Sequence, residues 1–168
     1  MNRWLRLLKH RRLDQGDARK LVDAAALQRI AARVAASEAR HSGEIRVCIE
    51  AGLPLSYLRR RATPRERAVA MFGKLRVWDT EQNNGVLIYL LLADHAIEIV
   101  ADRGLGRHAD AGHWQPVVAA MQGAFQGGQF EAGLNQAVDA VDAVLTRHFA
   151  LAAGEANPNE LPDAPDLR

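Results

Sequence analysis

The longest uninterrupted apolar run of this chain covers only eight residues, Val86 to Ala93. A bilayer-spanning helix needs about 20 apolar residues, so this run is too short to cross a membrane. Polar turns enclose it, residues 79–85 before it and residues 93–95 at its end. A short, enclosed apolar run is typical of a β-strand that is covered on both faces. We therefore expect a sheet with a layer of packed side chains on each side.

Two further strands are expected beside this run. Residues 44–50 alternate between polar and apolar side chains, with Ile45, Val47 and Ile49 on one face. Residues 96–101 follow the tight turn and form the second arm of a hairpin. The connection between the first two strands is long enough to carry a helix, which predicts that these strands pair in parallel. The sheet is thus predicted to be mixed.

Four helices are predicted to cover the sheet. Asp23 is the expected N-cap of a helix over residues 24–40. Residues 63–66 (Thr-Pro-Arg-Glu) supply the cap, proline and acid that begin a second helix, which ends near residue 76. Two more helices span about residues 113–125 and 130–149, separated by two glycines. The predicted fold class is α/β, a three-layer α/β/α sandwich around a small mixed sheet.

Residues 1–22 are predicted to form a basic, amphipathic N-terminal arm. Residues 1–20 hold seven basic and two acidic side chains, a net charge of +5. The apolar stretch Trp4–Leu8 is interrupted by Arg6 and lacks the cleavage site of a signal peptide, so we expect a cytoplasmic protein. Two alternatives are open for the arm. In the first, which we favour, the arm packs on its own domain or on a protein partner. In the second, it rests on an anionic membrane surface as a peripheral segment.

Residues 23–150 are predicted to form the folded domain, and residues 151–168 an acidic tail. From Gly154 onward the tail has a net charge of −3 and contains Pro158, Pro162 and Pro165. Proline and acidic residues without an apolar pattern are typical of disorder. The tail is therefore expected to be disordered.

Composition excludes several classes of protein. The chain is 48% hydrophobic and 25% charged, as globular domains usually are. Its single cysteine, Cys48, excludes an internal disulfide and a cysteine-based zinc site, and its place inside a strand indicates an unreactive thiol. The arm and the tail together account for the whole net charge of +2. Because the domain itself is neutral overall, no nucleic-acid partner is expected.

A group of polar residues is predicted to meet at one end of the sheet. Its members are Glu44, Asp79, Asn83, Asn84, Asp102 and Asp110. If the hairpin turns at residues 93–95, Asn84 lies roughly opposite Asp102 or Arg103, and the parallel strand begins at this same end. Oxygen ligands of this kind suit a hard cation such as Ca²⁺ or Mg²⁺. The alternative, which the sequence alone favours, is that these are turn and capping residues.

Basic residues also gather within the expected domain. The densest cluster is Arg59–Arg61, with Arg65 and Arg67 close by in the sequence. It is either a solvated face or a docking site for an acidic partner or a phosphate-bearing surface. Arg103 and Arg107 precede the helix near residue 112, whose N-terminus would favour an anion. The candidate binding residues are Arg59, Arg61, Arg65 and Arg103.

The order and spacing of several short motifs resemble the TPM domain family. These motifs are Gly43-Glu44-Ile45-Arg46-Val47, Arg65-Glu66-Arg67-Ala68 with Phe72, and Asn83-Asn84-Gly85-Val86-Leu87-Ile88. The likeness continues through Asp94, Ile97-Glu98-Ile99 and Gly104-Leu105 to Gly133-Leu134, and covers about residues 24–149. The family includes thylakoid-lumen proteins linked to photosystem II repair and many bacterial proteins that are secreted or anchored in a membrane.

The resemblance carries expectations about fold and chemistry. It implies an α/β/α sandwich, a divalent cation (Ca²⁺ or Mg²⁺) as cofactor, and the acid phosphatase activity proposed for some members. Carried over by position, the implied metal ligands are Asn84, Asp94, Asp102 and Asp110.

Two functions remain open from the sequence. The first is a non-enzymatic interaction module, with or without a bound divalent cation. It is supported by the absence of any common catalytic signature, such as a P-loop or a G-x-S-x-G or H-E-x-x-H motif. The alternative is a metal-dependent phosphatase, in which a cation held by Asn84, Asp102 and Asp110 would polarise a phosphoryl oxygen.

Overall fold

The apolar run of the sequence forms the interior strand β2 (Val86–Leu91) of a four-stranded sheet with the order β3-β2-β1-β4. The structure is a computed structural model that describes residues 3–109 and 111–168. Strand β1 (Ile45–Glu50) pairs with β2 in parallel, and β3 (Ala96–Ala101) pairs with it in antiparallel fashion. The predicted mixed sheet and hairpin are confirmed.

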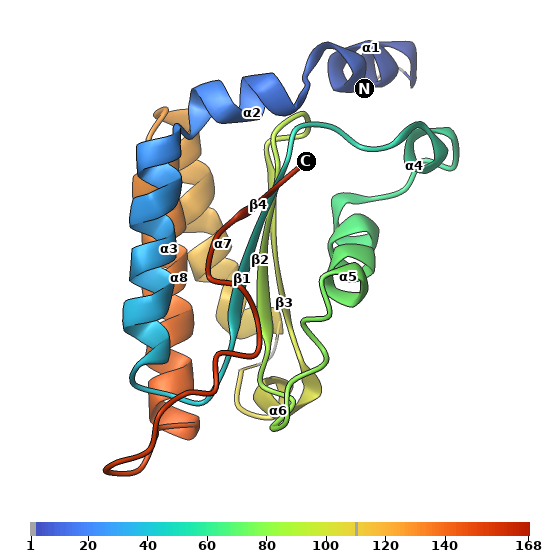
Figure 1. Ribbon diagram of the computed structural model, residues 1–168. Coiled ribbons are helices and arrows are strands. Elements are labelled where there is room, and N and C mark those ends of the chain that lie inside the picture. The colour runs from blue at the N-terminus through green and yellow to red at the C-terminus, as the bar shows by residue number, and fades with distance from the viewer. Residues whose placement is uncertain (1–2, 110) are drawn as a thin grey trace.

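Helices cover both faces of this sheet (Figure 1). Helices α3 (Ala24–Glu38), α7 (Ala111–Gln126) and α8 (Phe130–His148) lie on one face, and α5 (Pro64–Lys74) lies on the other. Side chains of β2 alternate between two cores, as a doubly covered strand requires. Val86, Ile88 and Leu90 join the α3/α7/α8 side, whereas residues 87, 89 and 91 join the α5 side. The predicted three-layer α/β/α sandwich is confirmed.

Local capping explains where two of these helices begin. The Asp23 side chain accepts from the Ala26 amide at 2.7 Å and caps α3. Thr63 and Glu66 form a reciprocal capping box at the start of α5, with Pro64 as its first residue. Helices α4 (Leu55–Arg59) and α6 (Arg103–Gly106) were not predicted, because neither has enough residues to show a helical period.

A buried ion pair joins α5 to the sheet. Arg67 Nη2 lies 2.6 Å from Glu50 Oε1, and the Tyr89 hydroxyl donates to Glu50 Oε2 at 2.6 Å. All three residues are buried, so each polar group depends on the others for its hydrogen bonds. Burial, followed by the Glu50 charge, raises the pKa of Tyr89. Nearby on β1, burial also raises the pKa of the Cys48 thiol, which agrees with the expected unreactive cysteine.

The C-terminal tail is ordered against the sheet, contrary to the expectation of disorder. Its last residues form β4 (Asp166–Leu167), which pairs in parallel with β1. Leu161 is buried in the α5-side core. The Arg46 side chain of β1 donates to the main-chain carbonyl groups of Pro162 and Ala164. The tail lacks an apolar pattern of its own, and it is held by groups of β1 that a sequence pattern does not reveal.

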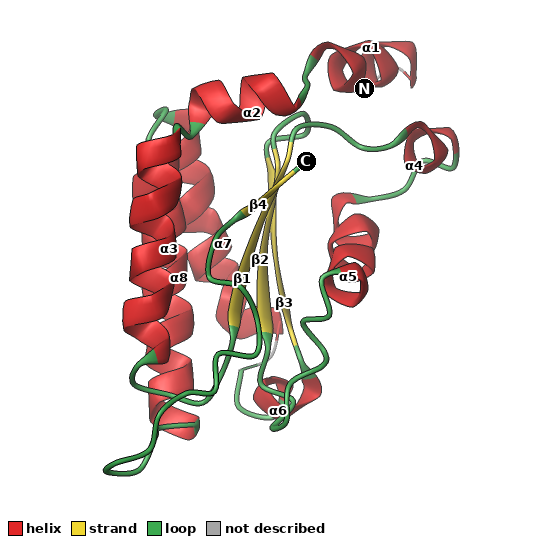
Figure 2. Cartoon of the chain, in the orientation of Figure 1, coloured by secondary structure: helices red, strands yellow, loops and turns green. Residues whose placement is uncertain are grey.

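The N-terminal arm consists of two helices, α1 (Arg3–Arg12) and α2 (Gln15–Leu21), which run across one end of the sheet (Figure 2). Asp14 caps α2 through a capping box with Asp17. Ala18 and Val22 are buried in the α3/α7/α8-side core. The arm therefore packs on its own domain, as the favoured sequence alternative expected.

Candidate functional site

Asn84 lies at the polar end of the sheet, directly before β2. Its side-chain amide donates to Ser42 Oγ at 3.2 Å, and its main-chain N–H donates to Thr80 Oγ1 at 3.1 Å. The residue is fully buried, yet its Oδ1 atom has no hydrogen-bond donor. A buried acceptor without a donor is unusual in proteins and is one feature of a ligand-binding site.

Asp102 lies at the same end, directly after β3. Its Oδ1 atom accepts from the Arg103 amide at 2.7 Å and so caps α6, as the capping alternative predicted. Its Oδ2 atom is buried and has no donor. The Asp102 N–H donates to the Gly85 carbonyl at 2.9 Å, which extends the β2–β3 ladder by one residue.

This extended ladder directs the two side chains to opposite sides of the sheet. A side chain added at Gly85, the ladder partner of Asp102, would strike Val77, which belongs to the α5-side core. A side chain added at Gly43, the β1 neighbour of Asn84, would strike Leu145 of α8. Because paired residues share a face, Asp102 faces the α5 side and Asn84 the α8 side. The two orphaned oxygens therefore do not face a common ligand position.

Asp94 lies at the other end of β2, in the hairpin turn. Arg6 Nη2 donates to its Oδ2 atom at 2.8 Å, and His10 Nε2 lies 3.0 Å from its Oδ1 atom. Partial burial alone would raise the pKa of Asp94, but the hydrogen bonds from His10 and Arg6 lower it to about 2. Asp94 thus fastens the N-terminal arm and is separated from Asn84 and Asp102 by the length of the sheet.

The remaining implied ligand, Asp110, lies outside the described residues. Among the residues that the structure describes, no three His, Cys, Asp or Glu side chains are grouped so as to hold a metal ion. The described members of the implied set, Asn84, Asp94 and Asp102, therefore do not fit one shared cation site.

All four candidate arginines are exposed, and two of them, Arg65 and Arg103, form hydrogen bonds. Arg65 Nη1 donates to the Ile99 carbonyl at 2.6 Å on the outer edge of β3, and Arg103 Nε donates to Asn83 Oδ1 at 3.3 Å. Arg103 also lines a cavity of about 340 Å³ together with Arg107, Gly104, Asn83 and Gln82. Arg59 and Arg61 are exposed at the end of α4.

One face of α1 packs on the domain and the opposite face is uncovered. The sequence alone did not distinguish these two faces. His10 Nδ1 accepts from the Leu53 amide at 3.0 Å, so His10, Arg6 and Leu53 join α1 to the domain. On the opposite side, Leu5 and Leu8 have exposed fractions of 60% and 56%. The i, i+4 spacing of Arg6 and His10 places both side chains on one face of the helix, and this spacing could have identified the docked face from the sequence.

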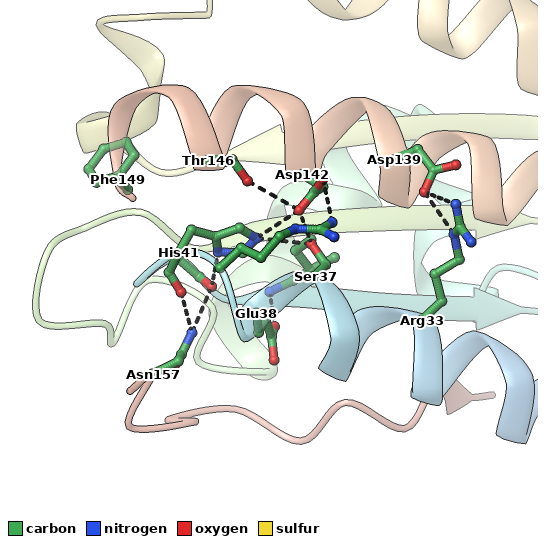
Figure 3. A network of polar contacts seen from close by, with 12 residues as sticks. Arg33, Ser37, Glu38, His41, Asp139, Asp142, Thr146, Phe149 and Asn157 are labelled. Atoms are coloured by element: carbon green, nitrogen blue, oxygen red, sulfur yellow. Dashed lines mark hydrogen bonds and ion pairs between the residues drawn. The ribbon is translucent and has the colours of Figure 1, made fainter. Parts of the chain in front are cut away.

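A buried polar network between α3 and α8 was also missed (Figure 3). Ser37 Oγ donates to Asp142 Oδ1 at 2.8 Å and lies 2.9 Å from His41 Nε2. The His41 Nδ1–H donates to the Gly43 carbonyl at 3.0 Å, and burial lowers the pKa of His41. Arg40 holds the second Asp142 oxygen at 2.7 Å.

This network contains serine, histidine and aspartate but lacks the arrangement of a catalytic triad. In a triad the aspartate orients the histidine by accepting from Nδ1–H, whereas here a main-chain carbonyl takes that bond. Asp142 instead accepts directly from Ser37, and the Ser37 and His41 side chains are buried. The network therefore joins the two helices.

Comparison with known proteins agrees with this fold. No curated protein matches the chain. The solution structure of BA42 from the psychrophilic bacterium Bizionia argentinensis is 26% identical, with a TM-score of 0.73 over 86% of this chain and 94% of that one. The N-terminal domain of a P. gingivalis protein shares the fold, with 20% identity and a TM-score of 0.63 over 79% of this chain and 83% of that one. The family model of the TPM domain matches residues 16–144, so the chain belongs to the TPM domain family.

Proposed function

We propose that this protein is an interaction module that binds anionic membrane surfaces through the outer face of α1. The observation that carries the proposal is the exposure of Leu5 and Leu8 on a helix that the domain holds by its other face. Large apolar side chains on the exposed face of a docked helix mark a surface for apolar contact. In the described part of the chain, no helix is long and apolar enough to cross a bilayer, so the contact would be peripheral.

The exposed basic side chains near Leu5 and Leu8 favour binding to an anionic partner. Arg12 lies on the same side of α1 as Leu5 and Leu8, at the spacing i, i+3 and i+7, and it is exposed, as is Arg11. No ion pair involves Arg11 or Arg12 among the described residues. A basic helix with exposed leucines is the usual form of an interfacial anchor.

Helix α4, next to α1, carries further exposed apolar and basic side chains. It contacts α1, and the two helices lie beside each other at one end of the molecule (Figure 1). Leu55 of α4 is 42% exposed, and Arg59 and Arg61 follow it on the surface. We define the outer surface as Leu5, Leu8, Arg11, Arg12, Leu55, Arg59 and Arg61. Each arginine close to an anionic bilayer contributes about 1 kcal/mol of attraction, which falls as salt rises.

Co-sedimentation with vesicles tests the proposal. The full chain should pellet with phosphatidylcholine vesicles that contain phosphatidylglycerol and should stay in solution with phosphatidylcholine alone. The double variant Leu5→Ser/Leu8→Ser should bind at least tenfold more weakly, because burial of a leucine contributes about 1.5–3 kcal/mol. Leu21→Ser, a change of an exposed leucine on α2, serves as the matched control and should bind as the unaltered chain does. Equal binding by the double variant would refute the proposal.

Phosphatase activity is the second candidate, since the family model carries that word in its name. The observation in its favour is the cavity of about 340 Å³ that Arg103 and Arg107 both line. Two guanidinium groups would bind a phosphate dianion there. Hydrolysis of p-nitrophenyl phosphate, assayed with and without Mg²⁺ and Ca²⁺, should then be lost in Arg103→Ala and kept in Arg76→Ala. Hydrolysis that survives Arg103→Ala would count against this candidate.

A further inference from the structure

Strand β3 is an outer strand of the sheet, and its outer edge is open. The N–H of Asp102 donates to the Gly85 carbonyl at 2.9 Å, which fixes the phase of the β2–β3 ladder. In an antiparallel pair, the main-chain groups of successive residues point alternately toward the partner strand and away from it. The N–H and C=O groups of Ile97, Ile99 and Ala101 therefore point away from β2. In the described part of the chain, no main-chain group bonds to them.

The Arg65 side chain of α5 covers part of this open edge. Its Nη1 atom donates to the Ile99 carbonyl at 2.6 Å and lies 3.6 Å from Glu98 Oε2. A charged side chain over an edge strand is a common means of keeping that edge from pairing with another chain. The Arg65 side chain is 51% exposed, so the competing main chain of a partner can replace it at the carbonyl.

A groove of about 730 Å³ runs along the same edge. Arg65 of α5 lines one side, Trp114 and Val118 of α7 line the other, and Ile97 and Ile99 of β3 lie between them. Helices α5 and α7 lie on opposite faces of the sheet (Figure 1). A strand added to β3 would therefore lie between two helical walls. A hollow of this form accepts a single extended chain, whereas a second sheet would have to bring its own covering helices into it.

Helix α7 gives the groove an uncharged wall. Its 16 residues include no Asp, Glu, Lys or Arg. A surface helix usually carries charged side chains on the face turned away from the core. The exposed residues of α7 that line the groove are instead Gln115, Ala119 and Gln122. Depletion of charged residues is typical of surfaces that a protein partner covers.

The opposite edge of the sheet shows what kind of segment such an edge accepts. There the C-terminal tail adds β4 to β1. The Arg168 N–H donates to the Ile49 carbonyl at 2.9 Å, and the Ala51 N–H donates to the Arg168 carbonyl at 2.8 Å. The Arg46 side chain of β1 donates to two further main-chain carbonyl groups of the tail. The added segment is thus extended, acidic and held by an arginine of the sheet.

We propose that the β3 edge binds an extended peptide segment of a protein partner, in which apolar and acidic side chains alternate. The peptide main chain would pair with the outward groups of Ile97, Ile99 and Ala101, and one of its N–H groups would replace Arg65 at the Ile99 carbonyl. Because successive side chains of a strand point to opposite faces, one set would meet the uncharged wall of α7 and the other set Arg65.

The charge of the peptide follows from the free donors of Arg65. Its Nε and Nη2 atoms have no partner among the described residues, because the bonds to Ile99 and Glu98 both use Nη1. A guanidinium group with unused donors favours a carboxylate. Glu98 is the less exposed member of the pair, at 26%, so the charge that the groove presents to a partner is that of Arg65.

Amide hydrogen exchange of the full chain, followed by NMR, tests the open edge and its occupant. In the free chain, the N–H groups of Ile97, Ile99 and Ala101 should exchange at least tenfold faster than those of Glu98 and Val100, which bond to β2. Millimolar acetyl-Glu-Val-Glu-Val-Glu-Val-amide should slow the first three at least threefold. Unchanged exchange with this peptide would overturn the proposal. Protection that rises with protein concentration without peptide would also overturn it, because the occupant would then be a second copy.

Two variants separate main-chain pairing from charge. Ala101→Pro removes an outward N–H but no bond to β2, so it should fold, which circular dichroism checks, and bind the peptide at least threefold more weakly. The unaltered chain should prefer this peptide to acetyl-Lys-Val-Lys-Val-Lys-Val-amide, and Arg65→Ala should lose the preference. Lys74→Ala, at an exposed lysine of α5 outside the groove, is the matched control and should keep it. A preference that survives Arg65→Ala would overturn the acidic character assigned to the partner.

The inference does not rest on membrane binding. The residues that line the groove include none of the outer surface. Leu5→Ser/Leu8→Ser should therefore bind the peptide as the unaltered chain does, and Ala101→Pro should still pellet with anionic vesicles. Loss of peptide binding in the double leucine variant would place the peptide on the outer surface and overturn the assignment to β3.

Discussion

His10 Nε2 lies 3.0 Å from Asp94 Oδ1 although the two residues are 84 positions apart in the sequence. The main-chain N–H of Leu53 donates to His10 Nδ1 at 3.0 Å, so the neutral ring carries its proton on Nε2 and donates it to Asp94. This contact, with the 2.8 Å ion pair from Arg6 Nη2 to Asp94 Oδ2, fixes α1 to the hairpin turn. The arm is thereby part of the folded domain.

Asp94→Ala should detach α1. The change leaves the buried His10 ring and the Arg6 guanidinium without their acceptor, so the free energy of unfolding should fall by about 1–3 kcal/mol. Trypsin should cleave after Arg11 and Arg12 faster than in the unaltered chain. Asp79→Ala, at an exposed acid, is the control and should change neither quantity. Unchanged proteolysis in Asp94→Ala would contradict the role assigned to this contact.

Acid should release the same contact at a defined pH. The pKa of Asp94 is about 2 in the folded chain and about 3.9 in an unfolded one, so its stabilisation is present above pH 4. It is lost as the pH falls from 4 toward 2 and amounts to roughly 2 kcal/mol. In Asp94→Asn, unfolding followed by circular dichroism should show a shallower loss of stability over that interval. An equal slope in the variant would assign the acid sensitivity to other groups.

His41 should make stability depend on pH in a higher range. Burial lowers the pKa of His41 in the folded chain, whereas an unfolded histidine titrates near pH 6.5. The unfolded chain then binds more protons, so this contribution is complete above pH 6.5 and declines as the pH falls below it. His41→Gln should flatten the free energy of unfolding between pH 7 and 5. His95→Asn, which alters an exposed histidine, should leave that slope unchanged.

Glu38 acts in the opposite direction. Its pKa is about 9 in the folded chain and about 4.3 when unfolded, so its contribution is complete below pH 4 and is lost as the pH rises toward 9. Without divalent cations, Glu38→Gln should therefore be more stable than the unaltered chain at pH 8, by on the order of 2–4 kcal/mol. Chemical denaturation in EDTA measures this difference. A variant that is less stable at pH 8 would show that the carboxylate is neutralised in some other way.

Arg46→Met should loosen the tail. The variant keeps the apolar stem but removes the donor for the carbonyl groups of Pro162 and Ala164. The Arg168 amide, which donates to the Ile49 carbonyl at 2.9 Å, should then exchange its hydrogen about 10–100 times faster, the equivalent of roughly 1.5–3 kcal/mol. Arg40→Met removes a surface arginine that bonds Asp142 and should leave that amide protected. Equal exchange in both variants would show that β4 holds the tail without Arg46.

The elements that could be predicted are those with short-range causes. Asp23 caps a helix whose first turn follows directly, and Thr63 and Glu66 bond each other three residues apart. The apolar run of β2 requires cover on both faces wherever the rest of the chain lies. These rules act within one turn or one strand, so a single sequence reveals them.

The candidate site was only partly predictable. The sequence placed Asn84 and Asp102 at one end of the sheet, and both lie there with an unbonded oxygen. Whether their side chains share a face of the sheet depends on the pairing of Asp102 with Gly85. A different turn geometry would shift this register by one residue and move the Asp102 side chain to the other face. The resemblance grouped Asp94 with these two residues as a metal ligand, but the hairpin turn, where the sequence also placed Asp94, lies at the other end of the sheet.

The layered fold could be predicted from the amino-acid sequence, because the apolar period, helix caps and turns are local properties of the backbone. The order of the two ends of the chain depends instead on contacts between distant residues of the folded protein. The arm is ordered by Asp94 and Leu53, and the tail by Arg46, Glu44 and the free edge of β1. These contacts use hydrogen-bonding groups that the paired strands leave free at the edge and ends of the sheet. Which groups remain free is known only once the strands have paired.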